Sequence, residues 1–173
     1  MEGKIGTLRL KHPTVQFKAV VADFSQMTTM QAYSDLVNDP SNGLKDIDIG
    51  LVFLNAGSVA IGPFDLLSDS QVETSITVNA LHPTYLTKAL LPLLSQRHKG
   101  ADTKQRSGMV VTSSGLAGMP MPSVQLYSST KACVSNFFQA LAYEVAHFGI
   151  DVMVWEPSST DTTFIADVPK SKF

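Results

Sequence analysis

Short apolar blocks alternate with helix-patterned segments along the whole chain, and this alternation is the feature that most constrains the fold. The strand-like blocks cover residues 15–21, 48–54, 109–112 and 150–155. The helical patterns cover residues 27–37, 69–97 and 124–147. Such alternation is typical of βαβ units around a parallel sheet. The sequence therefore predicts one α/β domain over residues 1–173.

Local signals indicate where the expected helices begin, bend and end. Ser25 and Thr28 are candidate caps for the first helix, because their hydroxyls can accept hydrogen bonds from its first turn. A bend is expected near Pro83 in the second helix, and Gly149 is expected to close the third. The apolar positions expected to face inward on the second helix are Ile76, Val78, Leu81, Leu86, Leu90 and Leu94.

Charge and composition exclude several classes of protein. The formal net charge is −2 and the basic residues are scattered, so the chain has no electrostatic basis for binding nucleic acid or an anionic membrane. Cys133 is the single cysteine, which rules out an internal disulfide, and we expect it to be buried. No long apolar stretch indicates a signal peptide or a membrane anchor. These features predict an intracellular protein with no metal site.

The strongest functional signal opens the third helix, where Tyr127 precedes Lys131 by four residues. That spacing puts both side chains on one face of a helix. A lysine ammonium beside a phenol stabilises the phenolate and lowers the pKa of the phenol, which suits acid–base chemistry near neutral pH. Ser114 follows the third strand, and ligands bind at the carboxyl ends of strands in open α/β sheets. Its hydroxyl could hold a substrate carbonyl beside the tyrosine.

Each of these residues also has a purely structural interpretation. A tyrosine and a lysine four residues apart are most often an amphipathic pair on a helix surface. One of the two serines, Ser113 or Ser114, is expected to be a simple turn residue. Asn79 could face solvent in the middle of a helix, and Asp23 could be a helix cap. Residues 55–57 could form a turn with no further role.

The order and spacing of five short motifs resemble the short-chain dehydrogenase/reductase family. The matching motifs are Leu54-Asn55-Ala56-Gly57, Val78-Asn79, Ser114, Tyr127 and Lys131. The resemblance implies that Tyr127 donates or accepts the proton and that Lys131 binds the nicotinamide ribose. It also implies that Ser114 orients the substrate carbonyl and that Asn79 holds a water of the proton relay.

The same resemblance assigns residues to the cofactor. Asp23 matches an acidic residue beside the adenine ring, and Thr162 matches a threonine at the cofactor amide. The turn beside the cofactor matches Asn55, Ala56 and Gly57. Many relatives carry Pro-Gly after the last strand, where this chain has Glu156, Pro157 and Ser158, and we assign Pro157 to the cofactor site. NADP(H) is favoured over NAD(H), although the residue that sets this choice follows a strand that the chain lacks.

Residues 113–131 narrow the resemblance to 17β-hydroxysteroid dehydrogenases and very-long-chain 3-oxoacyl-CoA reductases. This group implies an oxidoreductase that transfers a hydride between NAD(P)H and a carbonyl or secondary alcohol of a lipid-like substrate, a steroid or a 3-oxoacyl-CoA. Apolar side chains that would suit such a substrate flank the expected site at Met119, Met121 and Val124. The group also implies a location at the endoplasmic reticulum.

The family begins with a strand and a glycine-rich turn, TGxxxGxG, whose amides hold the cofactor pyrophosphate at a helix N-terminus. Residues 1–173 contain no such motif. The expected fold is a partial Rossmann-type, doubly wound parallel sheet that lacks the first two strands and the last. In that order, residues 15–21 and residues 51–54 are separated by an empty slot two strands wide.

An open sheet edge predicts association, either with a second copy in a homo-oligomer or with a partner that covers the edge. We expect the chain as given to be a truncated reductase that binds NAD(P)H weakly and is inactive. The alternative is a catalytically inactive relative that serves as a scaffold or assembly subunit.

Overall fold

The protein is represented by a computed structural model, and the structure describes residues 2–99 and 105–158. Its α-helices are α1 (Glu2–Lys11), α2 (Met30–Asn38), α3 (Asp69–Ile76), α4 (His82–Lys99) and α5 (Gln125–Val145). A π-helical stretch, η2 (Thr77–Leu81), joins α3 to α4, and short 3-10 helices lie at η1 (Phe64–Leu66) and η3 (Ala146–Phe148). The strands are β1 (Leu51–Leu54), β2 (Ser107–Thr112) and β3 (Ile150–Trp155).

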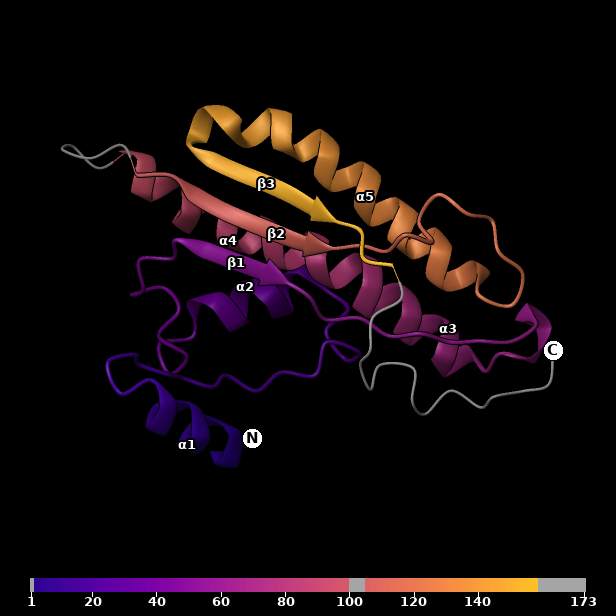
Figure 1. Ribbon diagram of the computed structural model, residues 1–173, viewed down its shortest axis with the longest axis horizontal. Helices are drawn as coiled ribbons and strands as arrows, with labels where there is room; N and C mark the ends of the chain where they lie inside the picture. Colours follow the sequence, from indigo (N-terminus) through magenta and orange to yellow (C-terminus); the bar gives the residue numbers. More distant parts are fainter. Residues whose placement is uncertain (1, 100–104, 159–173) are drawn as a thin grey trace.

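The strands of the described residues form one parallel sheet in the order β1-β2-β3 (Figure 1). Leu51 of β1 pairs with Gly108 of β2, which pairs in turn with Asp151 of β3. Each connection between neighbouring strands passes through a helix, as a parallel pairing requires. The predicted parallel α/β sheet is confirmed, and β3 has its predicted bounds. β1 and β2 begin at Leu51 and Ser107 instead of residues 48 and 109.

Residues 15–21, which were predicted to be a strand, form no strand in the structure. The prediction is wrong because a strand exists through hydrogen bonds to a neighbour, and no described strand lies beside this segment. An aromatic stack just after the segment holds it to the helices. The ring of Phe24 lies 3.6 Å from the imidazole of His82, and Tyr33 lies 5.9 Å from the same imidazole. Burial lowers the pKa of His82 to about 4, so this imidazole is neutral at neutral pH.

The first predicted helix begins three residues later than expected, and neither predicted residue caps it. Its cap is Thr29, whose hydroxyl accepts a hydrogen bond from the backbone N–H of Ala32 at 3.3 Å. Ser25 instead donates its backbone N–H and its hydroxyl to the Asp23 carboxylate. Both groups of Ser25 are therefore used in a turn that precedes the helix.

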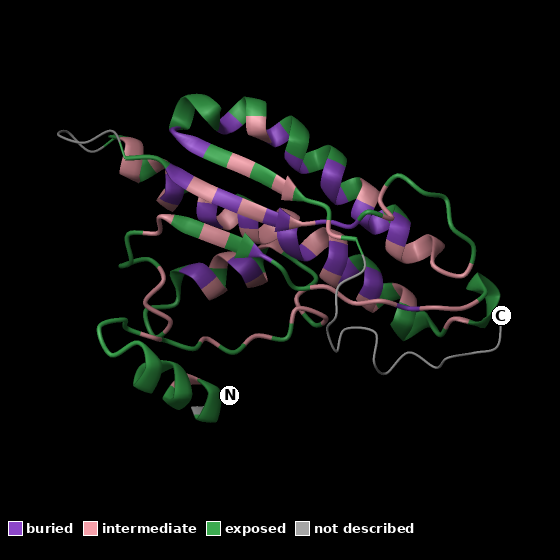
Figure 2. Ribbon diagram, in the orientation of Figure 1, coloured by how far each residue is buried: buried purple, intermediate pink, exposed green. Residues whose placement is uncertain are grey.

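The helices cover one face of the sheet and leave the other open. In Figure 1, α4 lies behind the strands and α5 lies along β3. Alternate residues of β2 are buried against these helices (Figure 2). In β1 and β3 only Leu54 and Ile150 are buried. The hydrophobic core contains Val37, Leu54, Leu90, Leu94, Met109, Val111, Val134, Phe138, Leu141, Val145 and Ile150. The open face exposes the large side chains of Leu51, Phe53, Met153 and Trp155.

The predicted long helix of residues 69–97 is present, but the π-helical stretch divides it. The backbone N–H of His82 donates to the carbonyl of Thr77, five residues back, so one extra residue fits into the helix here. That insertion rotates α3 relative to α4. As a result Ile76, predicted to face inward, is 40% exposed, whereas Leu90 and Leu94 are buried as predicted. Pro83 follows this stretch at the start of α4, and the expected bend there stays a prediction.

Two further expectations concern α5 and the turn after it. Gly149 follows the helix with φ 73°, and a Cβ at this position would collide with the ring of His98. Glycine is therefore required here, and its predicted role is confirmed. Cys133, predicted to be buried, is exposed, because it lies on the outer face of α5. No helix of the described residues is long and apolar enough to cross a membrane.

The packing of α5 on the sheet predicts the effect of a core substitution. Phe138 is 0% exposed in the core, whereas Tyr143 on the same helix is 87% exposed. Phe138→Ala should lower the free energy of unfolding by about 3–5 kcal/mol, because it opens a cavity that the neighbours cannot fill. Tyr143→Ala should change it by less than about 0.5 kcal/mol. Urea unfolding followed by circular dichroism measures both, and equal losses would contradict this packing.

Candidate active site

Tyr127 and Lys131 meet at the carboxyl end of β2. The first turns of α5 carry both residues past this end of the sheet. Lys131 Nζ donates a hydrogen bond to the carbonyl oxygen of Thr112, the last residue of β2, at 2.7 Å. The same nitrogen lies 5.8 Å from the centre of the Tyr127 ring. The two side chains therefore share one side of the helix, as a spacing of four residues predicts.

The Lys131 ammonium is buried where no carboxylate is within ion-pair distance among the described residues. The residue is only 3% exposed, and burial lowers the pKa of its ammonium to about 8. The ion pairs of the described residues join Arg97 to Asp48 and Arg106 to Asp151. Since one hydrogen bond to Thr112 uses only one of three N–H groups, the ammonium can donate to further acceptors.

The structure distinguishes the two serines after β2. Ser113 continues the series of inward residues from Met109 and Val111, and its hydroxyl bonds to the Lys131 carbonyl and to Ser135. Ser114 points the other way along the strand, as period-two alternation requires. Its hydroxyl accepts a bond from the backbone N–H of Leu116 at 3.2 Å. Among the described residues this is its one hydrogen bond, so the hydroxyl can still donate.

Asn79 is buried, so the interpretation that it faces solvent in the middle of a helix is wrong. It is 1% exposed and lies in the π-helical stretch. Its side-chain oxygen accepts from Ser58 N at 2.8 Å, and its nitrogen donates to Ser58 O at 2.9 Å and to Thr130 Oγ1 at 3.2 Å. Asn79 therefore ties the loop after β1 to α5, one residue before Lys131.

The turn of Asn55, Ala56 and Gly57 lies at the carboxyl end of β1, beside the same group. Asn55 Oδ1 accepts a hydrogen bond from Thr112 Oγ1 at 2.9 Å. This bond joins the ends of β1 and β2 at the residue whose carbonyl holds Lys131. Ala56 is exposed and Gly57 is half-buried, and the turn leads directly into Ser58, which Asn79 holds.

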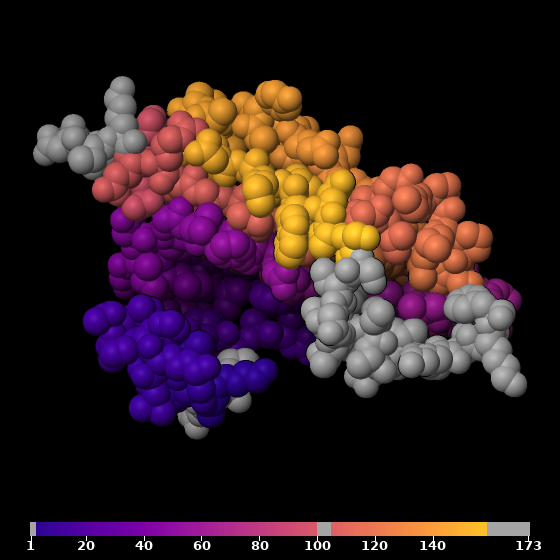
Figure 3. Space-filling view, viewed as in Figure 1, coloured from indigo at the N-terminus to yellow at the C-terminus, as the bar shows by residue number. Residues whose placement is uncertain are grey.

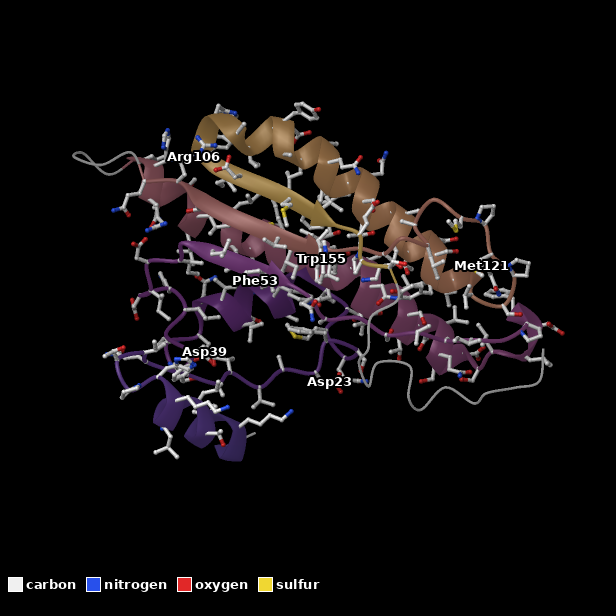
Figure 4. The ribbon with its side chains drawn as sticks, viewed as in Figure 1. Asp23, Asp39, Phe53, Arg106, Met121 and Trp155 are labelled. Carbon is white, nitrogen blue, oxygen red and sulfur yellow. The ribbon has the colours of Figure 1, made fainter. Side chains whose placement is uncertain are left out.

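The other residues assigned to the cofactor are more dispersed. The Asp23 carboxylate accepts from Ser25 at 2.7 and 3.0 Å, and so it stabilises a turn and caps no helix. Figure 4 draws Asp23 on the side of the sheet toward which the strands point. The Pro157 carbonyl accepts from Gly115 N at 2.9 Å, directly after Ser114. Thr162 lies outside the described residues.

Sequence reasoning missed three residues that the structure adds to this group. They are Thr130, Ser135 and Glu156, which bond to Asn79, Ser113 and Ser135 in that order. Strand alternation could have indicated Glu156, which comes two residues after Val154 and is exposed overall. Helical spacing could have found Ser135, four residues after Lys131.

A hollow of about 640 Å³ lies away from this group, between the N-terminal segment and α2. Its lining includes Val21, Met27, Leu36 and Asp39. Figure 3 shows the surface hollowed between the indigo N-terminal part and the magenta strand region. No residue of β1 lines the hollow, so the expected slot between residues 15–21 and β1 stays a prediction. The described residues contain no cluster of three or more histidine, cysteine or acidic side chains that could hold a metal ion.

The residues present fit one end of a nicotinamide cofactor better than the other. A buried ammonium with N–H groups to spare suits the hydroxyls of a ribose. For the pyrophosphate the described residues offer no TGxxxGxG turn between a strand and a helix, and Gly115 and Gly118, between β2 and α5, have a different spacing. Gly3 and Gly6 lie inside α1, with open space around each.

Comparison with known proteins identifies the family of this chain. The model of the short chain dehydrogenase family matches residues 7–172. The very-long-chain 3-oxoacyl-CoA reductase of Podospora anserina is 30% identical over 148 residues, which cover 84% of this chain and 40% of that protein. The human inactive hydroxysteroid dehydrogenase-like protein 1 is 31% identical over 154 residues, which cover 88% of this chain and 43% of that protein.

Comparison with solved structures shows a similar fold. The short-chain dehydrogenase of Sphingobium yanoikuyae, solved in complex with NADPH, superposes with a TM-score of 0.78 at 24% identity. The match covers 95% of this chain and 59% of that one, so the chain spans well under two thirds of its relatives. Taken with the family match over residues 7–172, these results show that the chain belongs to the short-chain dehydrogenase family.

Proposed function

We propose that this chain carries the catalytic residues of an NAD(P)H-dependent oxidoreductase that interconverts a carbonyl and a secondary alcohol. The observation that carries the proposal is the buried Lys131 ammonium, held at 2.7 Å from the Thr112 carbonyl and 5.8 Å from the Tyr127 ring. A buried charge without a carboxylate partner is costly, and strongly perturbed groups of this kind cluster at functional sites.

In reduction, NAD(P)H would supply a hydride to the carbonyl carbon when bound. Tyr127 gives its phenolic proton to the carbonyl oxygen, which becomes the alcohol hydroxyl. The Ser114 hydroxyl donates a hydrogen bond to the same oxygen and orients it. Lys131 holds the ribose hydroxyls and stabilises the phenolate that Tyr127 leaves behind. Oxidation of an alcohol uses the same groups in reverse.

Asn79 has a positioning role in this proposal. Its side chain is committed to Ser58 and Thr130, so a relay water would have to use the remaining lone pair of its side-chain oxygen or its main-chain carbonyl. The proline four residues later, Pro83, has no N–H to give that carbonyl in the α-helical pattern. The Asn55–Gly57 turn, Asp23, Pro157 and Thr162 complete the proposed cofactor contacts, with NADP(H) preferred.

The proposed substrate is lipid-like, a 3-oxoacyl-CoA or a steroid. The loop after Ser114 exposes Met119 and Met121, and Figure 4 labels Met121 at the end of the molecule beyond the strands. A hydrogen bond of 2.8 Å from Gly62 N to Ser123 O ties this loop to η1, where Phe64 and Leu66 are also exposed. Such an apolar rim suits a hydrophobic body, and a substrate of this class is consistent with work at the endoplasmic reticulum.

A second candidate function is that of a non-enzymatic scaffold. One relative carries the name inactive hydroxysteroid dehydrogenase-like protein 1, and the open face of the sheet exposes Leu51, Phe53, Met153 and Trp155. A scaffold would use that face, or the edge of β1, to bind a second copy or a partner. The two candidates are distinguished by measuring turnover in a form of the chain to which the missing cofactor-binding segment has been added.

The first test of catalysis is the variant Tyr127→Phe. The chain is joined to the strand, TGxxxGxG turn and helix of a relative, and carbonyl-dependent oxidation of NADPH is followed by absorbance. Losing the phenolic proton should lower turnover by about 10²–10⁴-fold. Tyr143→Phe, on the exposed side of the same helix, is the matched control and should keep full turnover. Equal turnover in the two variants would exclude Tyr127 as the proton donor.

The pKa of Lys131 predicts a dependence of stability on pH. The folded-state pKa is about 8 and the ordinary value is 10.5, so the unfolded chain holds this proton more tightly. Wild-type stability should therefore rise by about 3 kcal/mol between pH 7 and pH 10.5 through this group. Lys131→Met should lack that rise. Urea unfolding of both proteins measures the difference, and a difference that stays constant with pH would contradict the burial of a charged ammonium.

Cofactor affinity is the third test. Without a glycine-rich turn, the 173-residue chain lacks several charge-assisted hydrogen bonds to the pyrophosphate, each worth about 1.5–3 kcal/mol. Isothermal titration with NADPH and NADH should therefore give dissociation constants of millimolar order or weaker. A micromolar constant would mean that other residues of this chain hold the phosphates.

A further inference from the structure

A chain of short hydrogen bonds connects the end of β3 with α5 and β2, next to the proposed catalytic residues. Ser135 Oγ donates to Glu156 Oε1 at 2.6 Å. The hydroxyls of Ser135 and Ser113 lie 2.6 Å apart, and Ser113 Oγ reaches the Lys131 carbonyl at 3.0 Å. We propose that Glu156 is a positioning residue, which fastens α5 to the end of β3 through Ser135 and thereby fixes Lys131.

Strand geometry explains why a carboxylate reaches α5 at this point. Ile150, Val152 and Val154 face α5, and side chains two residues apart point the same way. Glu156 comes next at this spacing, just past the strand; the residue is exposed overall, but one carboxylate oxygen reaches Ser135 of α5. The pairing of the two chains also continues, because Ser113 N donates to Trp155 O at 2.8 Å and Gly115 N donates to Pro157 O at 2.9 Å. The ladder thus holds the Glu156 backbone on both sides and aims its side chain at α5.

The bonding pattern gives Glu156 a directing role. A carboxylate can only accept, so Ser135 gives its single hydroxyl proton outward to Glu156. The single hydroxyl proton of Ser113 is then shared between the Ser135 oxygen at 2.6 Å and the Lys131 carbonyl at 3.0 Å. The distance of 2.6 Å between Ser135 and Glu156 is that of a charge-assisted hydrogen bond, about 2.5–2.7 Å. The chain ends at a peptide carbonyl, which cannot pass a proton on, so it positions α5 and is no proton relay.

Lys131 is thereby held from two strands. The Thr112 carbonyl of β2 accepts a hydrogen bond from its ammonium, and the hydroxyl of Ser113, the next residue, donates to its main-chain carbonyl. Glu156 adds the tie to β3, through a serine four residues after Lys131. Any local opening that exposes the lysine has to lift the first turns of α5 from both strands, so it breaks this tie as well. Removing Glu156 should therefore make such openings more frequent.

The test measures how fast Lys131 reacts with acetic anhydride in the 173-residue chain, by mass spectrometry of its peptide. Glu156→Ala should react about tenfold faster, the factor expected when one hydrogen bond to a charged group is lost. Glu156→Gln should react within about twofold of wild type, because its amide oxygen still accepts from Ser135. Glu144→Ala, an exposed glutamate removed from α5, is the matched control and should leave the rate unchanged. The exposed Lys88 serves as the internal reference.

Ser135→Ala extends the test should Glu156→Ala fail to fold, as judged by circular dichroism. It should speed labelling of Lys131 by a similar factor, and adding Glu156→Ala to it should bring no further increase. The proposal is overturned if Lys131 is labelled at the wild-type rate in Glu156→Ala or in Ser135→Ala. It is also overturned if Glu156→Gln is labelled as fast as Glu156→Ala, or if the double variant is labelled about tenfold faster than Ser135→Ala. The inference rests on the proposed function only in that Lys131 is the residue held. Turnover of Lys131→Met tests the proposed function separately. If that variant keeps turnover, and the Glu156 and Ser135 variants label as described, the proposed function fails but the positioning role of Glu156 stands.

Discussion

The hydrogen bond from the Lys131 ammonium to the Thr112 carbonyl is the interaction around which the site is arranged. It requires a helix with a charged side chain on its inward face to pack against the end of a parallel strand. The described ion pairs involve Arg97 and Arg106, away from Lys131. Lys131 thus has its charge in a buried environment, where its hydrogen-bond partner among the described residues is the main-chain carbonyl of Thr112. That environment lowers the pKa of its ammonium, and it also strengthens the field that the ammonium exerts on nearby groups.

Much of this arrangement could be predicted from sequence, because it depends on local spacing. Tyr127 and Lys131 are four residues apart on a helix, and Ser114 follows a strand of unmistakable pattern. The predictions that were wrong concern features that depend on contacts with other residues, which the local pattern does not show. Residues 15–21 have the composition of a strand but no strand to pair with. The cap at Thr29 was missed because Ser25 is used by Asp23.

The misplaced orientation of Ile76 has a different origin. An apolar pattern with a period of 3.6 residues continues through residues 69–97, yet a π-helical stretch adds one residue and shifts everything before it. Nothing in the apolar pattern records that insertion. The functional consequence is the burial of Asn79 between Ser58 and Thr130. A helix with regular geometry would have carried this asparagine to a different side, so the irregularity and the site are one feature.

The inward face of α5 changes character along its length, and this change joins stability to function. The buried residues of its first part are polar apart from Val134, and its second part presents Phe138, Leu141 and Val145. The polar ones are Ser128, Thr130, Lys131 and Ser135. The polar half cannot pack itself, because its groups gain little from burial beyond their hydrogen bonds. The apolar half supplies the hydrophobic contact that keeps the whole helix on the sheet. Glu156 and Ser113 then fix the first part of α5 through hydrogen bonds to Ser135 and to the Lys131 carbonyl. A helix held rigidly at one end and tied by short hydrogen bonds at the other can carry a buried ammonium to a defined position.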